Sequence, residues 1–336
     1  MVQWTRRHFL QGTGAGIALL AAGRTAFSAD NSFRFITPFT LSLAFSPVLY
    51  ASAAGYYADE GLSVDIEAGK GASLVSQMVI AKRMESGRTG GTNYIVSRIN
   101  DGAPLISIAT IAQLSPFFVL SSAKDPVSSM ADLKGRTVGM ATLGGSMEGT
   151  IDLMLKKSGI SPDTVNKVKV ADSAASFALV EAGRAGAFVG NISSMITATN
   201  AMKDVSSMPI DDGIPGQVYV ARPDEIDANP ERFVKFLRAT HRAVLEIVEA
   251  EDLDPILTKL AGKYEINGIS DREIARQDLK ANAQNWAAKG KENLLRNMPE
   301  VWDSAVKLLA GADLVKEAVD AGTLYRNDLL DQALTK

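Results

Sequence analysis

Short β-type runs alternate with helical runs through the first two thirds of the chain, and this alternation limits the choice of fold more than any other feature. Residues 32–37 and 62–67 have the composition and alternation of strands, while residues 47–60 and 73–86 have the pattern of helices, the second ending at Gly87. Strands that are joined by helices usually pair in parallel through right-handed crossovers. We therefore predict an α/β fold with mainly parallel sheets.

The same pattern returns further along the chain and predicts a second α/β half. A short internal sequence similarity supports this division. Residues 85–90 resemble residues 181–186, and each segment leads through a strand to an asparagine, Asn93 or Asn191. The elements predicted for the second half are strands at residues 136–141, 167–170 and 187–189 and helices at residues 147–157 and 174–182.

From Asn229 onward the pattern becomes helical. Asn229 as the cap, Pro230 in the first turn and an apolar stripe over residues 233–248 predict one long helix. Residues 270–273 have the spacing of a capping box and predict the start of another helix. His241 borders the stripe, so we expect it to be partly buried and hydrogen-bonded and to have no chemical role.

The first 29 residues have the parts of a twin-arginine export signal. An arginine pair at residues 6–7 is followed by Phe-Leu and an apolar stretch at residues 12–23, and the small residues around Ser28 and Ala29 suit a signal peptidase. The apolar stretch is well short of the ~20 residues that cross a bilayer as a helix. We therefore expect export to the periplasm, with cleavage near Ser28 and Ala29 and without a permanent membrane anchor.

Charge and composition exclude several classes of function. Without the three arginines of the signal, the formal net charge falls from −3 to −6, which argues against nucleic acid as a partner because phosphate binding needs a clustered basic surface. The chain has no cysteine, and only His241 remains once the signal is removed. These facts exclude disulfides, thiolate chemistry, a lipidated cysteine and a multi-histidine metal site, so we expect neither a metal nor another cofactor.

Three segments carry a resemblance to a known family. Residues 51–64 are similar to that family's helix through GYFAEEGLDV, residues 132–139 are similar to its DLKGKKVGV, and residues 229–233 are similar to its NPE helix start. The family is the nitrate, sulfonate and taurine group of periplasmic solute-binding proteins, which also contains thiamine-precursor binders and feeds ABC transporters. The resemblance extends over most of the chain that follows the signal.

This resemblance implies the type II periplasmic binding fold, in which two α/β lobes joined by hinge crossovers close on a ligand. It implies crossovers near residues 115–118 and 217–220, C-terminal helices that pack on the first lobe, and an ABC permease of the inner membrane as the partner. We expect a monomer. The implied division is a discontinuous first lobe at residues 30–117 and 219–336 and a second lobe at residues 118–218.

The chain departs from the family at two places. Members usually carry an aspartate shortly after the glycine that ends a helix, as in SGQVDFG, whereas this chain has GRTG at residues 87–90 and GRAG at residues 183–186. Those aspartates chiefly organise the lobes. Their absence therefore weakens the assignment of a subfamily and of a ligand more than the assignment of the fold.

Two glycine-rich helix starts are the first candidates for ligand binding. The N–H groups and the dipole at a helix N-terminus favour an anion, glycines permit close approach of the backbone, and hydroxyls add donors. Plain N-capping explains either loop on its own equally well, but two loops at equivalent points favour binding. The candidates are Gly71, Ala72 and Ser73 in the first lobe and Thr142, Gly144, Gly145 and Ser146 in the second.

Six further candidates follow predicted strands or precede the first crossover. Ligands of open α/β sheets bind beyond the carboxyl ends of strands, and aromatic residues there could pack against a carbon skeleton. Core or rim positions explain each aromatic residue singly, and turn formation explains the asparagines as well as ligand contact does. These candidates are Phe39, Thr40, Asn93, Tyr94, Gln113 and Asn191.

Three functions stay open at the level of the sequence. The favoured one is capture of a small organic anion, such as a sulfonate or taurine-like compound, for an ABC import system. The alternative is an aromatic or pyrimidine-type ligand such as a thiamine precursor, which Phe39, Tyr94 and the lack of an obvious arginine clamp favour. An enzyme on the same fold is disfavoured, because the related enzymes depend on cysteine or histidine chemistry.

Overall fold

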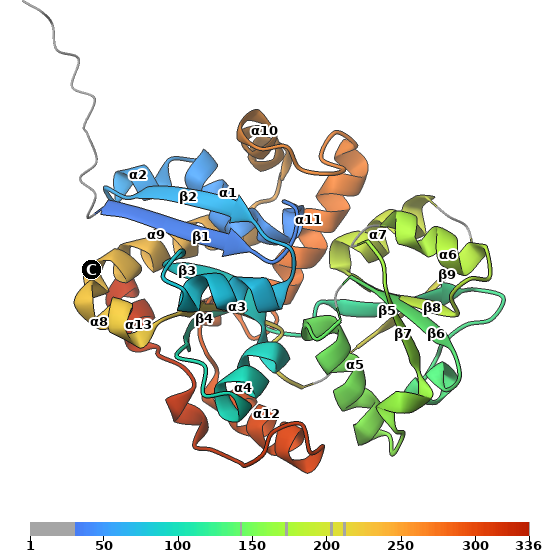
Figure 1. The fold of residues 1–336 in the computed structure, drawn as a ribbon. Helices are drawn as coiled ribbons and strands as arrows, with labels where there is room; N and C mark the ends of the chain where they lie inside the picture. The colour runs from blue at the N-terminus through green and yellow to red at the C-terminus, as the bar shows by residue number, and fades with distance from the viewer. Residues whose placement is uncertain (1–30, 142, 172–173, 202–203, 211–212, 336) are drawn as a thin grey trace, which may run out of the picture.

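The computed structural model describes residues 31–335 apart from residue 142 and residues 172–173, 202–203 and 211–212. These residues form two lobes, each built around a five-stranded sheet (Figure 1). We call them the first lobe, which contains the N-terminal strand, and the second lobe. The predicted α/β class and two-lobed fold are confirmed.

The two sheets have the same topology. In each sheet one strand pairs in parallel with two neighbours. Another strand, which the chain reaches directly from the other lobe, pairs antiparallel with two neighbours. In spatial order, the first sheet consists of β2 (Ser63–Ala68), β1 (Ser32–Thr37), β3 (Ser86–Gly90), β10 (Gln217–Ala221) and β4 (Ile106–Ala112). The second sheet consists of β7 (Asn166–Lys169), β6 (Thr137–Met140), β8 (Ala187–Asn191), β5 (Phe117–Ser122) and β9 (Val205–Pro209).

The prediction of mainly parallel sheets is wrong for one strand of each sheet. Strand β10 runs antiparallel to β3 and β4, and strand β5 runs antiparallel to β8 and β9. Both strands enter their sheet directly from the other lobe, after β9 and β4 respectively, without a crossover helix that would set their direction. The return crossing ends before Gln217, and residues 217–220, near which the resemblance placed it, belong to strand β10.

Helices cover both faces of the first sheet. One face packs against α1, α9, α10, α11 and α13, and the other packs against α3, α4 and α12. The helices are α1 (Ser46–Ala53), α2 (Tyr56–Asp59), α3 (Ala72–Ile80), α4 (Gly91–Asn100), α5 (Ser146–Lys157), α6 (Ala178–Glu181), α7 (Ile192–Ala201), α8 (Pro223–Ala228), α9 (Pro230–Glu249), α10 (Asp254–Lys263), α11 (Arg272–Trp286), α12 (Pro299–Gly311) and α13 (Asp328–Leu334).

The C-terminal helices complete the core of the first lobe, as the family resemblance implied. Phe33 and Phe35 point from β1 to the same face of the sheet, because side chains alternate along a strand. Phe236 of α9 stacks on Phe33 with a centroid distance of 4.4 Å, and Tyr57 stacks on the same ring of Phe236 at 5.5 Å. The apolar stripe predicted for this helix is therefore the stripe that it buries.

Several helix ends differ from the prediction for local reasons. The helix expected at residues 47–60 is broken into α1 and α2 at Gly55, which has a φ of 85°. Helix α3 already ends at Ile80, well before Gly87. Helix α11 is capped by Asp271, whose carboxylate accepts a hydrogen bond from the Ile274 N–H, so the cap lies one residue after the predicted one.

Asn229 stands at the start of α9 as predicted, but its side chain does not cap the helix. Its Nδ2 instead donates to Glu225 at 3.1 Å. On the same helix His241 is half-buried, and burial together with the charge of Arg296 lowers the pKa of its imidazole. The charged form of His241 is therefore disfavoured, which agrees with a structural role for this residue.

No helix in the described part of the chain is both long and apolar enough to cross a membrane. The export signal predicted at residues 1–29 lies outside the described residues.

Candidate ligand-binding site between the lobes

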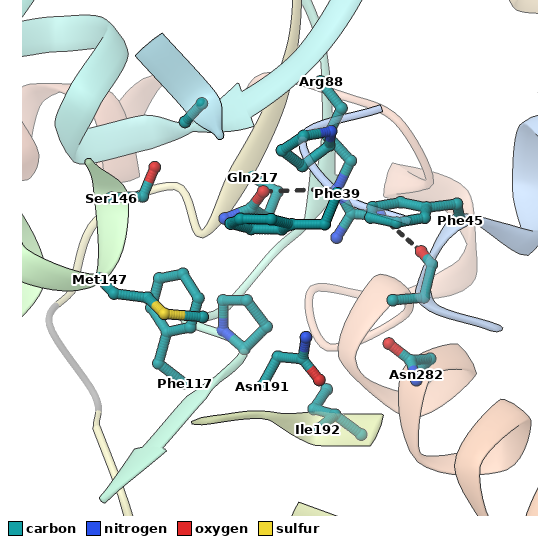
Figure 2. Close-up of a pocket in the computed structure, with 14 residues that line it drawn as sticks. Phe39, Phe45, Arg88, Phe117, Ser146, Met147, Asn191, Ile192, Gln217 and Asn282 are labelled. Atoms are coloured by element: carbon teal, nitrogen blue, oxygen red, sulfur yellow. Dashed lines mark hydrogen bonds between the residues drawn. The ribbon is translucent and has the colours of Figure 1, made fainter. Parts of the chain in front are cut away.

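A cavity of about 30 Å³ lies where strand ends of both lobes meet, which is the place where α/β folds of this kind bind ligands. Figure 2 shows Arg88 and Phe39 in the upper part of the view and Asn191 and Asn282 in the lower part. The lining residues are Pro38, Phe39, Ala44, Phe45, Ala72, Arg88, Pro116, Phe117, Ser146, Met147, Asn191, Ile192, Gln217 and Asn282.

Four of the residues that we singled out in the sequence line this cavity. Phe39 follows β1, Ala72 begins α3, Ser146 begins α5, and Asn191 ends β8. Thr142, also a candidate, lies outside the described residues. The structure therefore brings together residues from both glycine-rich helix starts and from two strand ends.

Four other candidates lie at the rim of the cavity or support it. Ser73 donates to the carbonyl of Gly144 across the lobes at 3.1 Å, and so joins the two helix starts. Gly71 and Gly145 precede α3 and α5, where neither has a side chain that could cap. The N–H of Gly71 is taken by the Pro38 carbonyl.

The glycine loop of the second lobe offers fewer backbone donors than we expected. The Gly144 N–H donates to Glu148 in the first turn of α5, and the Glu148 carboxylate also pairs with Lys167. A carboxylate of the protein itself therefore occupies part of the helix start. Simple capping accounts for this amide, so an anion must be held mainly by side chains.

The remaining candidates lie elsewhere. Tyr94 is fully buried in the first lobe, where its hydroxyl donates to the Leu324 carbonyl at 2.5 Å and its ring packs against Trp302. The Gln113 amide ties the end of β4 to the carbonyls of Asn293 and Arg296.

Asn93 and Thr40 are also outside the cavity wall. The Asn93 side chain donates to Thr89 within its own lobe at 3.2 Å, and Thr40 is exposed. Both residues follow strand ends as predicted, but neither lines the cavity, and Asn93 lies in the first turn of α4.

Arg88 is a candidate residue that the sequence reasoning missed, as are Gln217 and Asn282. Arg88 lies on β3, is 3 % exposed, and donates from Nε to Gln217 at 3.4 Å and from Nη1 to the Ala44 carbonyl at 2.5 Å. Its guanidinium also lies 4.9 Å from the centre of the Phe45 ring. Within the described part of the chain, no carboxylate is close enough to form an ion pair with Arg88.

Burial lowers the pKa of Arg88 to about 10, so its guanidinium stays positively charged at neutral pH. A buried charge without a partner is costly, and proteins rarely keep one unless an opposite charge arrives. The sequence did carry a signal for this site. Arg88 is the one charged residue in the five-residue strand SGRTG, and all five of its residues are buried.

Two further donors line the cavity on the side of Arg88. Gln217 accepts from Arg88 through Oε1, which directs its Nε2 the other way. Ser146 Oγ accepts from the Gly90 N–H at 3.1 Å, so its hydroxyl hydrogen can still donate to a ligand. Arg88, Gln217 and Ser146 thus form a donor-rich wall.

Asn191 and Asn282 are held by their neighbours on another wall. Asn191 Oδ1 accepts from the Ser194 N–H at the start of α7. Asn282 Nδ2 donates at 2.7 Å to Asp278, which also accepts from Ser193 of the second lobe at 2.8 Å. This small network fixes both the side chain of Asn282 and the contact between the lobes.

The two lobes are in contact around the cavity. Besides the Ser73–Gly144 and Gly90–Ser146 hydrogen bonds, Phe39 of the first lobe packs against the hydrophobic core of the second. Leu153 of α5 in turn lies buried in the core of the first lobe. The cavity is therefore closed on several sides, and a ligand larger than a few atoms requires side chains of its wall, such as Phe39, to move.

Comparison with known proteins agrees with this geometry. The family model described as "NMT1/THI5 like" matches residues 42–252. The riboflavin-binding protein RibY of Chloroflexus aurantiacus is 22% identical over 336 residues, which covers 92% of this chain and 91% of that protein.

Two solved structures show the shared fold. A protein of Bordetella bronchiseptica RB50 superposes with a TM-score of 0.72 at 20% identity, covering 90% of this chain and 96% of its own. The alkanesulfonate-binding protein SsuA of Xanthomonas axonopodis pv. citri, bound to MOPS, superposes with a TM-score of 0.64 at 14% identity, covering 88% of this chain and 98% of its own. The chain therefore belongs to the NMT1/THI5-like family and has the two-lobed fold of periplasmic solute-binding proteins.

Proposed function

We propose that the protein is the periplasmic solute-binding component of an ABC import system and that it captures a small organic anion, such as a sulfonate or taurine-like compound. The observation that carries this proposal is Arg88, a buried cation on the cavity wall with no carboxylate near it in the described chain. An anionic ligand would offset the cost of that charge and accept charge-assisted hydrogen bonds from it. The export signal and the family support delivery to a permease.

Arg222 shows how the same chain buries an arginine for structure alone. It is 4 % exposed, nearly the same as Arg88, but its guanidinium pairs with Asp224 at 3.1 Å and Glu225 at 3.0 Å. It also donates to the Val79 carbonyl, and it does not line the cavity. The contrast supports the proposal that Arg88 binds a ligand in addition to its hydrogen bonds within the fold.

The test compares two variants by titration calorimetry with ethanesulfonate, taurine, nitrate and benzoate. A hydrogen bond to a charged group contributes about 1.5–3 kcal/mol, so Arg88→Gln should weaken binding of the preferred anion roughly 10- to 150-fold. Arg222→Gln is the matched control, which should lower the stability and leave the affinity within a factor of three. Unchanged affinity in Arg88→Gln, or binding of uncharged ligands alone, would contradict the proposal.

A second candidate is an aromatic or pyrimidine-type ligand. The rings of Phe39, Phe45 and Phe117 line the cavity, and such rings suit a planar apolar body. The mass of the ligand that remains bound after native purification, measured after denaturation, separates the two candidates. A neutral heterocycle would favour the second and an aliphatic acid the first.

We further propose that the ligand is released chemically unchanged. Of the described residues that line the cavity, only Arg88 has a titratable side chain, and an arginine is a poor proton donor or acceptor at neutral pH. Recovery of the ligand with an unchanged mass after long incubation with the protein is the expected result. A product of different mass would show that the site catalyses a reaction.

A further inference from the structure

A buried asparagine of helix α11 presents an acceptor to the cavity. Asn282 is 2 % exposed, and its Nδ2 donates both to the Asp278 carboxylate at 2.7 Å and to the Asp278 carbonyl at 3.0 Å. Because those two partners can only accept, the amide nitrogen must point toward Asp278 and the amide oxygen away from it. Figure 2 shows this oxygen directed toward the cavity.

The Oδ1 atom of Asn282 accepts no hydrogen bond from any residue that the structure describes, and it is open to the cavity rather than enclosed by protein (Figure 2). A ligand that fills the cavity closes this oxygen off from solvent, so a donor group on the ligand is favoured there. This preference is opposite in sign to that of the Arg88 wall. There, Arg88, Gln217 and Ser146 all present donors.

Aromatic rings line the cavity beside these two polar regions (Figure 2). Phe39 and Phe117 come from different lobes, and Phe45 lies against the Arg88 guanidinium at 4.9 Å. The cavity is narrow, at about 30 Å³, so a flat body between rings requires less displacement of the side chains of the wall than a branched one. The donor-rich wall, the aromatic rings and the Asn282 acceptor together favour a ligand with an anionic group, a planar body and a hydrogen-bond donor.

We propose that the ligand is a planar aromatic acid, with its carboxylate or sulfonate at Arg88 and a hydroxyl or amino group that donates to Asn282 Oδ1. The proposal rests on the proposed function, since it names the class of anion for the same cavity. It differs from that function in two requirements, the aromatic body and the donor.

The test is a set of matched probes titrated into the whole protein. 3-Hydroxybenzoate and 4-hydroxybenzoate carry both groups, 3-fluorobenzoate and 4-fluorobenzoate keep the acid and lack the donor, and ethanesulfonate and taurine lack the ring. We expect one hydroxybenzoate isomer to bind at least 10-fold tighter than its fluoro counterpart. It should also bind at least 10-fold tighter than ethanesulfonate and taurine.

Variants then assign the donor preference to Asn282. In Asn282→Ala the ratio of affinities between the hydroxy and fluoro probes should fall to within a factor of three. A general loss of stability cancels from this ratio, because both probes meet the same variant. Gln284→Ala, an exposed change on the same helix, should keep the wild-type ratio.

Each alternative result has a distinct meaning. A hydroxy-to-fluoro ratio near one in the wild type, or a ratio that Asn282→Ala leaves intact, overturns the role of Asn282. Tighter binding of ethanesulfonate or taurine than of every benzoate overturns the aromatic class and leaves the anion function standing. If no anionic probe binds and a neutral compound does, the proposed function itself fails.

Discussion

Adding one methyl group at Gly90 tests whether ligand capture requires the contact between the lobes. Gly90 ends β3 in the first lobe, and its N–H donates to Ser146 Oγ of the second. A Cβ at this position would lie 2.1 Å from Ser146 Oγ and 2.3 Å from Ser146 Cβ. Gly90 has a φ of −75° and a ψ of 146°, an ordinary extended conformation, so alanine adds a steric clash without backbone strain.

The size of the effect follows from that overlap. Ordinary contact for a Cβ begins near 3.4 Å, so the second lobe must withdraw by more than about 1 Å, because a Cβ atom and not a flexible end is in the way. Overpacking typically costs about 1–3 kcal/mol. Because the clash exists only in the closed state, which binds the ligand, this cost weakens the affinity roughly 5- to 150-fold.

Titration calorimetry with benzoate and ethanesulfonate measures the loss, and small-angle scattering should show a larger radius of gyration for Gly90→Ala. Ser146→Gly removes both clashing atoms, so the double variant Gly90→Ala with Ser146→Gly should bind as well as Ser146→Gly alone. Gly262→Ala, where a Cβ meets nothing within 4 Å, is the control and should bind like the wild type. Wild-type affinity in Gly90→Ala, or no rescue in the double variant, would refute the reasoning.

Two further predictions concern stability. Burial raises the pKa of Asp278 to about 6, above its value in the unfolded chain, so the native state binds the extra proton and the contribution of Asp278 to the free energy of unfolding should rise as the pH falls from 7 to 4. Two pKa units correspond to about 3 kcal/mol at most, and urea titrations should show that Asp278→Asn removes this dependence. Leu153 is 1 % exposed and is buried in the core of the opposite lobe. Leu153→Ala should lower the free energy of unfolding in urea by about 2–5 kcal/mol. A decrease below about 1 kcal/mol would show that the packing of the lobes does not depend on this residue.

Local patterns in the sequence predicted most of the architecture, because periodicity and helix-start chemistry act over a few residues. The strand at residues 32–37 and the helix that begins at Pro230 form as predicted, since each buries the apolar side that its spacing defines. Such local patterns could not predict that β10 runs antiparallel to its neighbours. Its direction depends on the chain entering the sheet from the other lobe, which is a property of the whole chain path.

The sequence by itself determined the α/β class, the two halves, the family resemblance and the part of the site that lies at strand and helix ends, such as Phe39, Ser146 and Asn191. Only the tertiary structure brought Arg88, Gln217 and Asn282 to one cavity. Pairing of β3 with β10 places Gln217 beside Arg88, and packing of α11 turns Asn282 toward them. Arg88 suits an anion because it is buried and has no carboxylate partner among the described residues. Burial and ion pairing both depend on residues that are distant in the sequence.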